Sequence, residues 1–397
     1  MSRLNKLIEE LCPEGVEWKK LGDIGSFYGG LTGKSKKDFG NGNAKFITYM
    51  NVYSNPALNP ETTDTVQISE GEKQNKVQYG DILFTGSSET PDECGMSSVV
   101  TIELNEDYYL NSFCFGYRLH KQDEFLPDYL KHYFRSQEVR REIARTASGV
   151  TRYNVSKAKF AKIEIPVPPL PVQEEIVRIL DKFTTLEAEL EAELDCRKRQ
   201  YEFYRDQLLS FEGERSEGVK WMKLGDITEI LRGRRLTKKE LSNTASYPVF
   251  HGGIAPIGFY SQFNRPANTV MIINVGASAG TVGFCNQDFW SSDGCFCIGK
   301  SEKINDKFLY YLLAKNQHSF VTRVRHAGIP TLDSKVIADY TIPVPSLSEQ
   351  RRIVSILDRF EALTTDLQSG LPAEIKARRK QYEYYREKLL TFKRCQN

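Results

Sequence analysis

Several signatures of catalysis are missing from this chain of 397 residues. It has no Walker-type lysine loop, no HExxH pair and no GxSxG elbow, which argues against the commonest nucleotide, zinc-protease and hydrolase sites. Asn55-Pro56-Ala57 lacks the Pro-Pro-aromatic continuation of an adenine methyltransferase, and Pro91-Asp92 lacks the lysine that completes a nuclease site. These absences favour a binding protein over an enzyme.

Cysteine, histidine and net charge are also sparse or unpatterned. The eight cysteines include no CxxC pair, the five histidines form no spaced set, and the net charge is only +2. Cys295 and Cys297 alternate on a predicted strand, with Cys285 nearby, and buried apolar cysteines are expected there rather than a zinc site. We therefore predict no metal or cofactor in this chain. With no signal peptide and no apolar run of spanning length, we expect a cytoplasmic protein with reduced thiols.

The sequence does contain an internal repeat, and its other features are interpreted in the light of that repeat. EGVEWKKLGDI and EGVKWMKLGDI are identical at nine of eleven positions, and two further blocks return in the same order. Three matched blocks in one order indicate a tandem duplication. The pairs are 14–24 with 217–227, 165–183 with 342–360, and 199–211 with 380–392.

Each half begins with a globular part. Short apolar stretches broken by Gly, Asn, Ser and Pro predict strands joined by loops, followed by a helix near Leu126–Arg145 or Asp306–Val324. We therefore expect two mixed α/β globules of the α+β class. The expected strands are Lys45–Asn51, Asp81–Thr85, Ser98–Leu104, Phe113–Leu119, Thr269–Val275, Val282–Cys285 and Gly294–Gly299.

Each half ends with a long helix. Apolar residues alternate steps of three and four, which is the spacing of a coiled-coil seam. The first helix (173–211) has 39 residues and spans about 58 Å; the second should break at Ser369–Pro372 and restart with Pro372 in its first turn. The predicted seam is Ile176, Ile179, Phe183, Leu186 and Leu190 in the first helix, and Ile353, Ile356, Phe360, Leu363 and Leu367 in the second.

The order globule, helix, globule, helix constrains the architecture. If the second helix pairs with the first, it must run antiparallel and return toward the first globule and a short N-terminal helix bearing Leu4, Leu7, Ile8 and Leu11. The expected molecule is pseudo-two-fold symmetric, with the helices holding the globules apart. The expected domains are 1–165, 166–212, 213–342 and 343–397.

The two globules differ far more than the helices do. Ile24 to Ile165 is 141 residues and Ile227 to Ile342 is 115, so the first globule has 26 more. A shared frame with divergent loops is typical of two readers with different targets. Basic residues on Gly-rich loops recur at matching places in both halves; one such run alone would be a solvated face, but its recurrence favours phosphate contacts. These residues are Lys34, Lys36, Lys37, Arg232, Arg234, Arg235, Lys238 and Lys239.

Polar residues near two other pairs of turns are further candidates for DNA contact. Hydroxyl, amide and basic side chains on Gly-containing turns suit base edges or backbone, although a tight turn explains part of the pattern equally well. The set comprises Ser87, Ser88, Arg145, Ser148, Thr151 and Arg152 in the first half, and His251, Asn274, Ser278, Arg323, Arg325 and His326 in the second.

Together the repeated blocks resemble the specificity subunit of bacterial type I restriction–modification systems. The resemblance rests on the duplicated Glu-Gly-Val-x-Trp-x-x-Leu-Gly-Asp-Ile, on Ile-Pro-Val-Pro-x-Leu-x-x-Gln with Ile-Val-x-Ile-Leu-Asp, and on the Gln-Tyr-Glu-aromatic-Tyr-Arg tail, and it covers nearly the whole chain. It implies that each globule is a target-recognition domain reading one half of a split, asymmetric site in double-stranded DNA, and that the helices set the spacer.

The same resemblance implies partners. Two methyltransferase subunits would dock on the helical regions and bind S-adenosylmethionine, and restriction subunits would use ATP, leaving this chain without catalysis or membrane contact. The four-residue difference between the two helices, and Pro372, leave the spacer length open. Two alternatives remain at this point: the recognition part of a self-contained methyltransferase or nuclease, and a helical scaffold that does not bind DNA.

Overall fold

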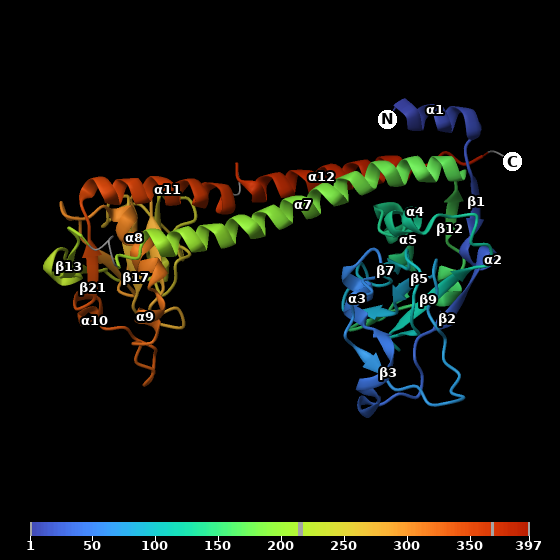
Figure 1. Cartoon of the computed structure of the whole chain (residues 1–397), viewed down its shortest axis with the longest axis horizontal. Coiled ribbons are helices and arrows are strands. Elements are labelled where there is room, and N and C mark those ends of the chain that lie inside the picture. The colour runs from blue at the N-terminus through green and yellow to red at the C-terminus, as the bar shows by residue number, and fades with distance from the viewer. Residues whose placement is uncertain (1, 213–216, 367–368, 396–397) are drawn as a thin grey trace. The chain divides into compact units, whose positions relative to one another are not determined.

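The computed structural model divides into two compact units (Figure 1). The residues that it describes are 2–212, 217–366 and 369–395. Unit 1 comprises Met1–Leu190 and Ile375–Asn397, and unit 2 comprises Glu191–Glu374. The prediction of two tandem mixed α/β domains with a long helix between them is confirmed. The predicted domain limits and the pseudo-two-fold relation stay predictions.

Unit 1 contains a globule with three sheets and the pair β1–β12. The main sheet is antiparallel in the order β2-β9-β5-β7, a second sheet β4-β3-β8 has one parallel pair, and a small third sheet joins β10, β11 and β6. The elements are α1 (Ser2–Leu11), β1 (Glu17–Lys20), α2 (Leu21–Ile24), β2 (Gly25–Gly29), η1 (Lys36–Asp38), β3 (Phe39–Ile47), α3 (Tyr49–Ser54), β4 (Thr65–Val66), β5 (Ile82–Thr85), β6 (Ser87–Ser88), β7 (Ser97–Val99), β8 (Tyr108–Leu110), β9 (Cys114–Leu119), α4 (Pro127–Tyr133), α5 (Gln137–Thr146), β10 (Ala147–Ser148), β11 (Tyr153–Val155), α6 (Lys157–Phe160) and β12 (Glu164–Val167).

Unit 2 repeats the two larger sheets and the strand pair of unit 1. Its main sheet β14-β20-β17-β18 corresponds to β2-β9-β5-β7, its sheet β16-β15-β19 again contains one parallel pair, and β13 pairs with β21 as β1 pairs with β12. The 26 additional residues of the first globule therefore lie outside the shared framework of these sheets. The elements are β13 (Lys220–Lys223), η3 (Leu224–Asp226), β14 (Ile230–Arg232), η4 (Lys238–Glu240), β15 (Tyr247–Phe250), β16 (Gly258–Tyr260), β17 (Thr269–Ile273), β18 (Val282–Cys285), β19 (Trp290–Ser291), β20 (Cys295–Ile298), α8 (Asp306–Lys315), α9 (His318–Val321), α10 (Ser334–Ala338) and β21 (Thr341–Val344).

Three of the predicted elements end or divide differently in the structure. The strand expected over Lys45–Asn51 ends at Ile47, because the Thr48 hydroxyl accepts from Asn51 N and starts α3 instead. The helix expected over Leu126–Arg145 is two helices, α4 and α5, with the break at 134–136. The helix expected over Asp306–Val324 is likewise divided into α8 and α9.

The two long helical regions begin and end close to their predicted places. The first is α7 (Leu170–Leu208), which has 39 residues but starts three residues earlier than predicted, because Pro171 fits within a first helical turn. The second consists of α11 (Leu347–Thr365) and α12 (Leu371–Leu389), so the predicted break is present and Pro372 lies in the first turn of α12.

Each unit pairs part of α7 with another helix. In unit 1, α7 runs antiparallel to α12: the rings of Phe183 and Tyr385 stack at 5.2 Å, and Glu187 accepts a bond from Arg379 further along. In unit 2, the ring of Tyr204 stacks on Phe360 of α11 at 5.6 Å. The antiparallel helix pair that the sequence predicted therefore exists within unit 1.

The start of each helical region packs against its own globule rather than only against another helix. Ile176 and Leu180 are fully buried in the core with Phe84 and Tyr117, and Ile353 and Leu357 are buried with the corresponding strands of unit 2. Ile179, Phe183, Leu186, Leu190, Ile356 and Phe360 are half-buried, Leu363 is exposed, and Leu367 lies outside the described residues. The periodicity therefore missed Leu180 and Leu357, because the globule, not a partner helix, covers that face.

A buried glutamine joins helix and globule in both units. Gln173 Nε2 donates to Pro168 O at 2.8 Å and to Glu124 O at 2.9 Å, and its Oε1 accepts from Leu126 N at 2.8 Å. Gln350 makes the same three bonds to Pro345 O, Lys303 O and Asn305 N, at 2.8, 3.1 and 2.7 Å. Both side chains are fully buried. The glutamine of the repeated Ile-Pro-Val-Pro block thus fixes α7 or α11 to the segment that starts α4 or α8.

The end of the chain completes unit 1. Val16 N donates to Lys393 O at 2.9 Å and Cys395 N donates to Val16 O at 3.0 Å, so the C-terminal segment lies beside the chain leading into β1. Gly15 makes this approach possible: its φ is +107°, and a Cβ there would lie 2.5 Å from Lys393 O. The return of the second helix toward the first globule, expected from element order, is present.

Candidate nucleic-acid interface

The small sheet of unit 1 brings two of the predicted contact segments together. β11 pairs with β10 on one side and with β6 on the other, so that Tyr153 lies opposite Ser88. Arg152 Nε donates to Ser87 Oγ at 3.1 Å across this sheet. Ser148 and Thr151 are exposed on the same hairpin. Residues more than sixty positions apart thus form one polar surface.

A pocket of about 490 Å³ opens beside this sheet. Its walls include Tyr49, Met50, Phe113 and Arg152, whose guanidinium carbon lies 5.2 Å from the centre of the Phe113 ring. Such an aromatic and cationic wall suits the stacking face of a base. The sequence did not single out Tyr49, Met50 or Phe113, because it predicted all three within strands. Tyr49 and Met50 in fact lie in α3, and Phe113 precedes β9.

An acidic residue lies at the rim of the same pocket. Glu93 accepts bonds from Tyr53 at 2.9 Å, from Thr90 at 3.0 Å and from Ser88 at 3.2 Å. These hydrogen bonds, that of Tyr53 above all, lower the pKa of Glu93 and keep it ionised. A carboxylate repels phosphate but accepts from an exocyclic amino group such as that of cytosine, so the pocket suits a base edge better than a backbone.

Unit 2 has a hairpin at the corresponding place. Arg325 and Thr331 exchange two backbone bonds of 2.9 and 3.0 Å, and Leu332 N donates to Asn274 O at 2.9 Å. Asn274 is buried, and its Oδ1 has no hydrogen-bond partner among the described residues. His251 Nδ1 lies 3.3 Å from Asp293 Oδ1. The strand that carries Asn274 and the hairpin that carries Arg325 are thus joined, as Ser87 and Arg152 are in unit 1.

Other predicted residues of unit 2 and unit 1 lie outside these hairpin sheets or at their ends. Ser278 is half-buried in the turn before β18, and His326 is exposed in the hairpin loop. Arg323 donates to Ser319 O at the end of α9, and exposed Arg145 is paired with Glu142 on α5. The side chains of Arg323 and Arg145 are therefore bonded to groups of α9 and α5.

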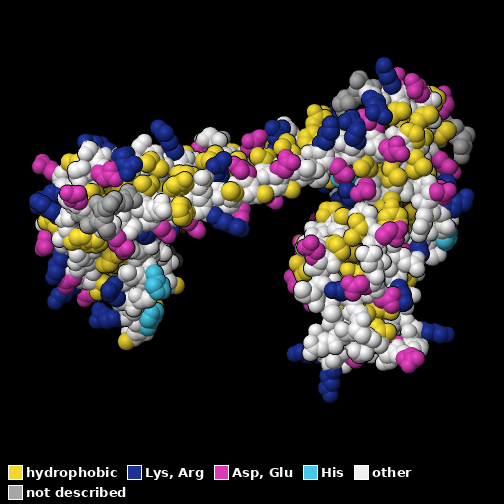
Figure 2. All heavy atoms as spheres, viewed as in Figure 1, with side chains coloured by type: hydrophobic (Ala, Val, Ile, Leu, Met, Phe, Trp, Pro, Cys, Tyr) yellow, Lys and Arg dark blue, Asp and Glu magenta, His cyan; other side chains and the backbone are white. Residues whose placement is uncertain are grey.

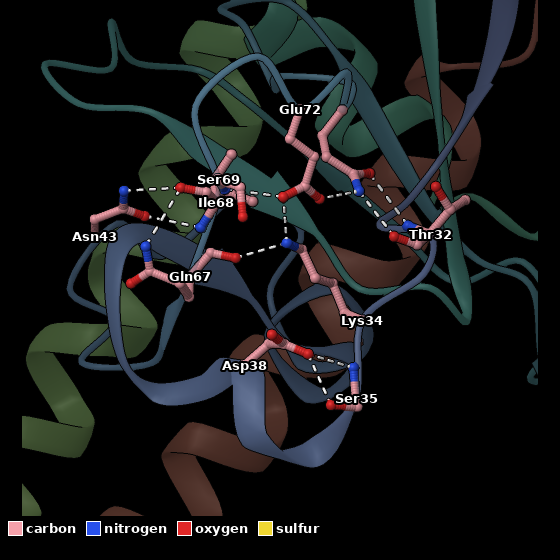
Figure 3. Close-up of polar contacts among 10 residues, drawn as sticks. Thr32, Lys34, Ser35, Asp38, Asn43, Gln67, Ile68, Ser69 and Glu72 are labelled. Carbon is pink, nitrogen blue, oxygen red and sulfur yellow. Dashed lines mark hydrogen bonds and ion pairs between the residues drawn. The ribbon is translucent and has the colours of Figure 1, made fainter.

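Lys34 is used inside the protein (Figure 3). Its Nζ donates to Glu72 Oε2 at 2.5 Å and to Gln67 O at 2.6 Å, and its side chain is only 9% exposed. The bond from Lys34 lowers the pKa of Glu72 to about 2. Lys34 therefore binds groups of its own unit, whereas the sequence predicted that it would contact phosphate. Lys36 and Lys37 are exposed, and basic side chains project from the end of unit 1 farthest from α7 (Figure 2).

The basic loop of unit 2 is anchored by its backbone. Arg234 N donates to Ser291 O at 2.9 Å, and Trp290 Nε1 donates to Arg234 O at 2.7 Å. A Cβ on Gly233 would lie 2.0 Å from Ser292 O, so only glycine allows this approach. The side chains of Arg232, Arg234, Arg235 and Lys239 are exposed, and that of Lys238 lies outside the described residues.

A search of the described residues finds no group of three or more His, Cys, Asp or Glu side chains that could hold a metal ion. Cys285, Cys295 and Cys297 instead lie in an apolar cluster of unit 2 with Phe250 and Phe289. Within the same described part of the chain, no helix combines the length and apolar content needed to cross a membrane.

Known proteins resemble this chain in sequence and in fold. The specificity subunit of the type I restriction enzyme EcoR124I/EcoR124II of Escherichia coli is 35% identical over 60% of this chain and 65% of its own. A putative type I specificity subunit of Mycoplasma pneumoniae is 38% identical over 57% of this chain and 92% of its own. The crystal structure of a type I S subunit from M. genitalium matches with a TM-score of 0.57 at 17% identity, covering 95% of this chain and 96% of that one.

The family described as the type I restriction modification DNA specificity domain matches residues 13–195 and again residues 216–377. These two matches follow the two repeats and cover most of the chain. The chain therefore belongs to the family of type I restriction–modification DNA specificity proteins.

Proposed function

We propose that this chain is the DNA-recognition subunit of a type I restriction–modification complex, in which each globule reads one half of a split, asymmetric site. The observation that carries the proposal is the pairing of one shared framework with two different polar ends. The main sheets have the same strand order, whereas the pocket with Phe113 and Glu93 in unit 1 is replaced by His251, Asp293 and Asn274 in unit 2. Different base-reading groups on equal frames are what a two-part asymmetric site requires.

The basic loops supply the part of binding that carries no sequence information. Arg232 is exposed at the end of β14, and Arg234 and Arg235 are exposed on the following loop, whose backbone is fixed, which suits contact with phosphates at a defined register. The net charge of +2 gives little general attraction to DNA, so affinity would depend on these local groups and on the assembled complex.

The chemistry would then belong to partners. Two methyltransferase subunits docked on the helical regions would bind S-adenosylmethionine and modify adenine, and restriction subunits would use ATP. This chain would supply no catalytic group, in keeping with the missing motifs, and would act in the cytoplasm where the DNA is.

Methylation mapping tests the proposal directly. The full chain is co-expressed with the methyltransferase subunit of its system in a host free of DNA methylation, and modified adenines are mapped by single-molecule sequencing. The expected result is one split motif with a fixed gap. Methylation by the purified chain alone would identify a self-contained enzyme. Co-purification with the methyltransferase without any sequence preference on DNA would identify a scaffold and refute the recognition role.

A further inference from the structure

Among the described residues, the two most exposed large hydrophobic side chains, Val150 and Ile329, lie on the two hairpins of the candidate nucleic-acid interface. Val150 is 90% exposed and Ile329 is 70% exposed, far more than most large hydrophobic side chains of the described chain. Each stands in a loop of a β-hairpin, between Ser148 and Asn154 in unit 1 and between Arg325 and Thr331 in unit 2. Single exposed aliphatic residues are common on protein surfaces, so the surroundings must decide whether these two matter.

The hairpins themselves are rigidly built. In unit 1 the loop is closed by the pair Ser148–Asn154, and Val155 N donates to Gly86 O at 3.0 Å to hold the hairpin on the strand of Ser87. In unit 2, Gly276 N donates to Pro330 O at 2.9 Å and Leu332 N donates to Asn274 O. Both loops have five residues, 149–153 and 326–330, and each hairpin is bonded to the segment that follows the corresponding main-sheet strand, β5 or β17. Backbone hydrogen bonds at the base of each hairpin therefore hold its loop in place.

A glycine with positive φ precedes the apolar residue in each loop. The φ of Gly149 is +152° and that of Gly328 is +87°, and a Cβ on Gly149 would lie 2.0 Å from Arg152 O. In both loops the residue that follows this glycine, Val150 or Ile329, is exposed. Val150 is the second residue of its loop and Ile329 is the fourth of its own, so the two residues do not occupy equivalent loop positions. What the loops share is a glycine followed by a β-branched residue.

Basic residues flank both tips. Arg152 lies two residues after Val150, and its guanidinium packs over Phe113 at 5.2 Å. Arg325 and His326 precede Ile329 and are exposed. Figure 1 shows the segment between α9 and α10 extending from the globule away from α11, and histidine side chains mark that end of unit 2 in Figure 2. A narrow, apolar-tipped β-ribbon with cationic flanks is complementary to a DNA groove, because the major groove admits a two-stranded ribbon.

We propose that Val150 and Ile329 are apolar reading tips, each contacting the bases of its own half-site when the complex binds DNA. This inference rests on the proposed recognition function and names the residues that enter the groove. The chemistry that would cover these side chains is the apolar surface of a base, which is either a thymine methyl or the face of an opened base step. Either contact removes from water a side chain that the free protein leaves exposed.

The test uses the complex of the full chain with its methyltransferase subunit and duplexes carrying the mapped site. Val150→Ser and Ile329→Ser are compared with the wild type and with Ile102→Ser, an exposed control 41% accessible in a different loop of unit 1. Because most of the surface of Val150 and Ile329 is exposed, the variants should fold and assemble normally. We expect each to weaken specific binding roughly tenfold, the change for losing one buried aliphatic contact, and to relax selectivity in one half-site only.

Further measurements identify the apolar partner. The salt dependence of binding should stay unchanged in both variants, since no phosphate contact is lost. If the partner is a thymine methyl, replacing that thymine by deoxyuridine should weaken the wild type but not the serine variant. If it is an opened step, 2-aminopurine at that step should brighten with the wild type and not with the variant.

Two outcomes would overturn the inference. If both serine variants bind each half-site within twofold of a sequence-selective wild type, the tips do not read bases, although the recognition function stands. If the wild-type complex itself shows no sequence preference, the recognition function fails and the reading tips fail with it.

Discussion

Replacing Gln173 by Met tests how the helical region is fixed to the first globule. Methionine keeps the length of the side chain and removes its polar atoms, so Pro168 O, Glu124 O and Leu126 N lose the partners they have in the structure. The bond to Pro168 is fully buried, and the other two are partly buried. A buried polar group left unpaired costs about 1–3 kcal/mol, and partly buried groups regain some hydration. We expect a loss of about 3–5 kcal/mol in the stability of unit 1.

Hydrogen exchange followed by mass spectrometry localises the effect. Amides of α4 should open more easily in Gln173→Met, while those of α8 should not change, and Gln350→Met should show the reverse because its three bonds lie in unit 2. Gln122→Met is the matched control: Gln122 is exposed on the segment before α4. A loss below about 1 kcal/mol in Gln173→Met, or an equal loss in the control, would show that these bonds do not hold the helix to the globule.

Three other perturbations have defined outcomes. His132 is buried between Asp181 and Tyr382, and burial lowers its pKa below the ordinary 6.5, although the hydrogen bond with Asp181 opposes this. The unfolded chain therefore takes up this proton first as the pH falls, so the stability of unit 1 should be retained above about pH 6.5 and decrease below it. Denaturant titrations at several pH values should show this decrease in the wild type and not in His132→Phe. An equal dependence of stability on pH in both proteins would exclude His132 as its source. Gly15→Ala should reduce the free energy of unfolding by about 2 kcal/mol or more, because a Cβ would collide with Lys393 O. Gly218→Ala is the control at the repeated position, where φ is +74° and the space around the glycine is open, and it should cost less. Equal losses of thermal stability in the two variants would contradict the steric argument. The double variant Arg234→Ala, Arg235→Ala should weaken DNA binding by the assembled complex and reduce the slope of log K against log salt concentration by about 2. Unchanged binding and an unchanged slope would show that neither residue contacts DNA.

The repeat explains how much could be predicted. Blocks such as Glu-Gly-Val-x-Trp and Ile-Pro-Val-Pro are local patterns, and the structure places both copies in the same pairing, Trp18 opposite Pro166 and Trp221 opposite Pro343. Helix length and the break before Pro372 also follow from local rules, because apolar spacing and proline geometry act within one or two turns. The fold class and the helix framework could therefore be inferred from the sequence.

Tertiary structure alone decided which polar residues work together. Lys34 looked like a free cation, but folding brought Glu72 and Gln67 to its ammonium group. Phe113 and Arg152, distant in the sequence, share one pocket because β5 pairs with β9 and β6 pairs with β11. The aspartate of the repeated Ile-Leu-Asp block meets His132 in unit 1 and Tyr311 in unit 2. Local patterns set the frame because their energies depend on near neighbours, whereas the candidate site depends on long-range contacts that no spacing in the chain encodes.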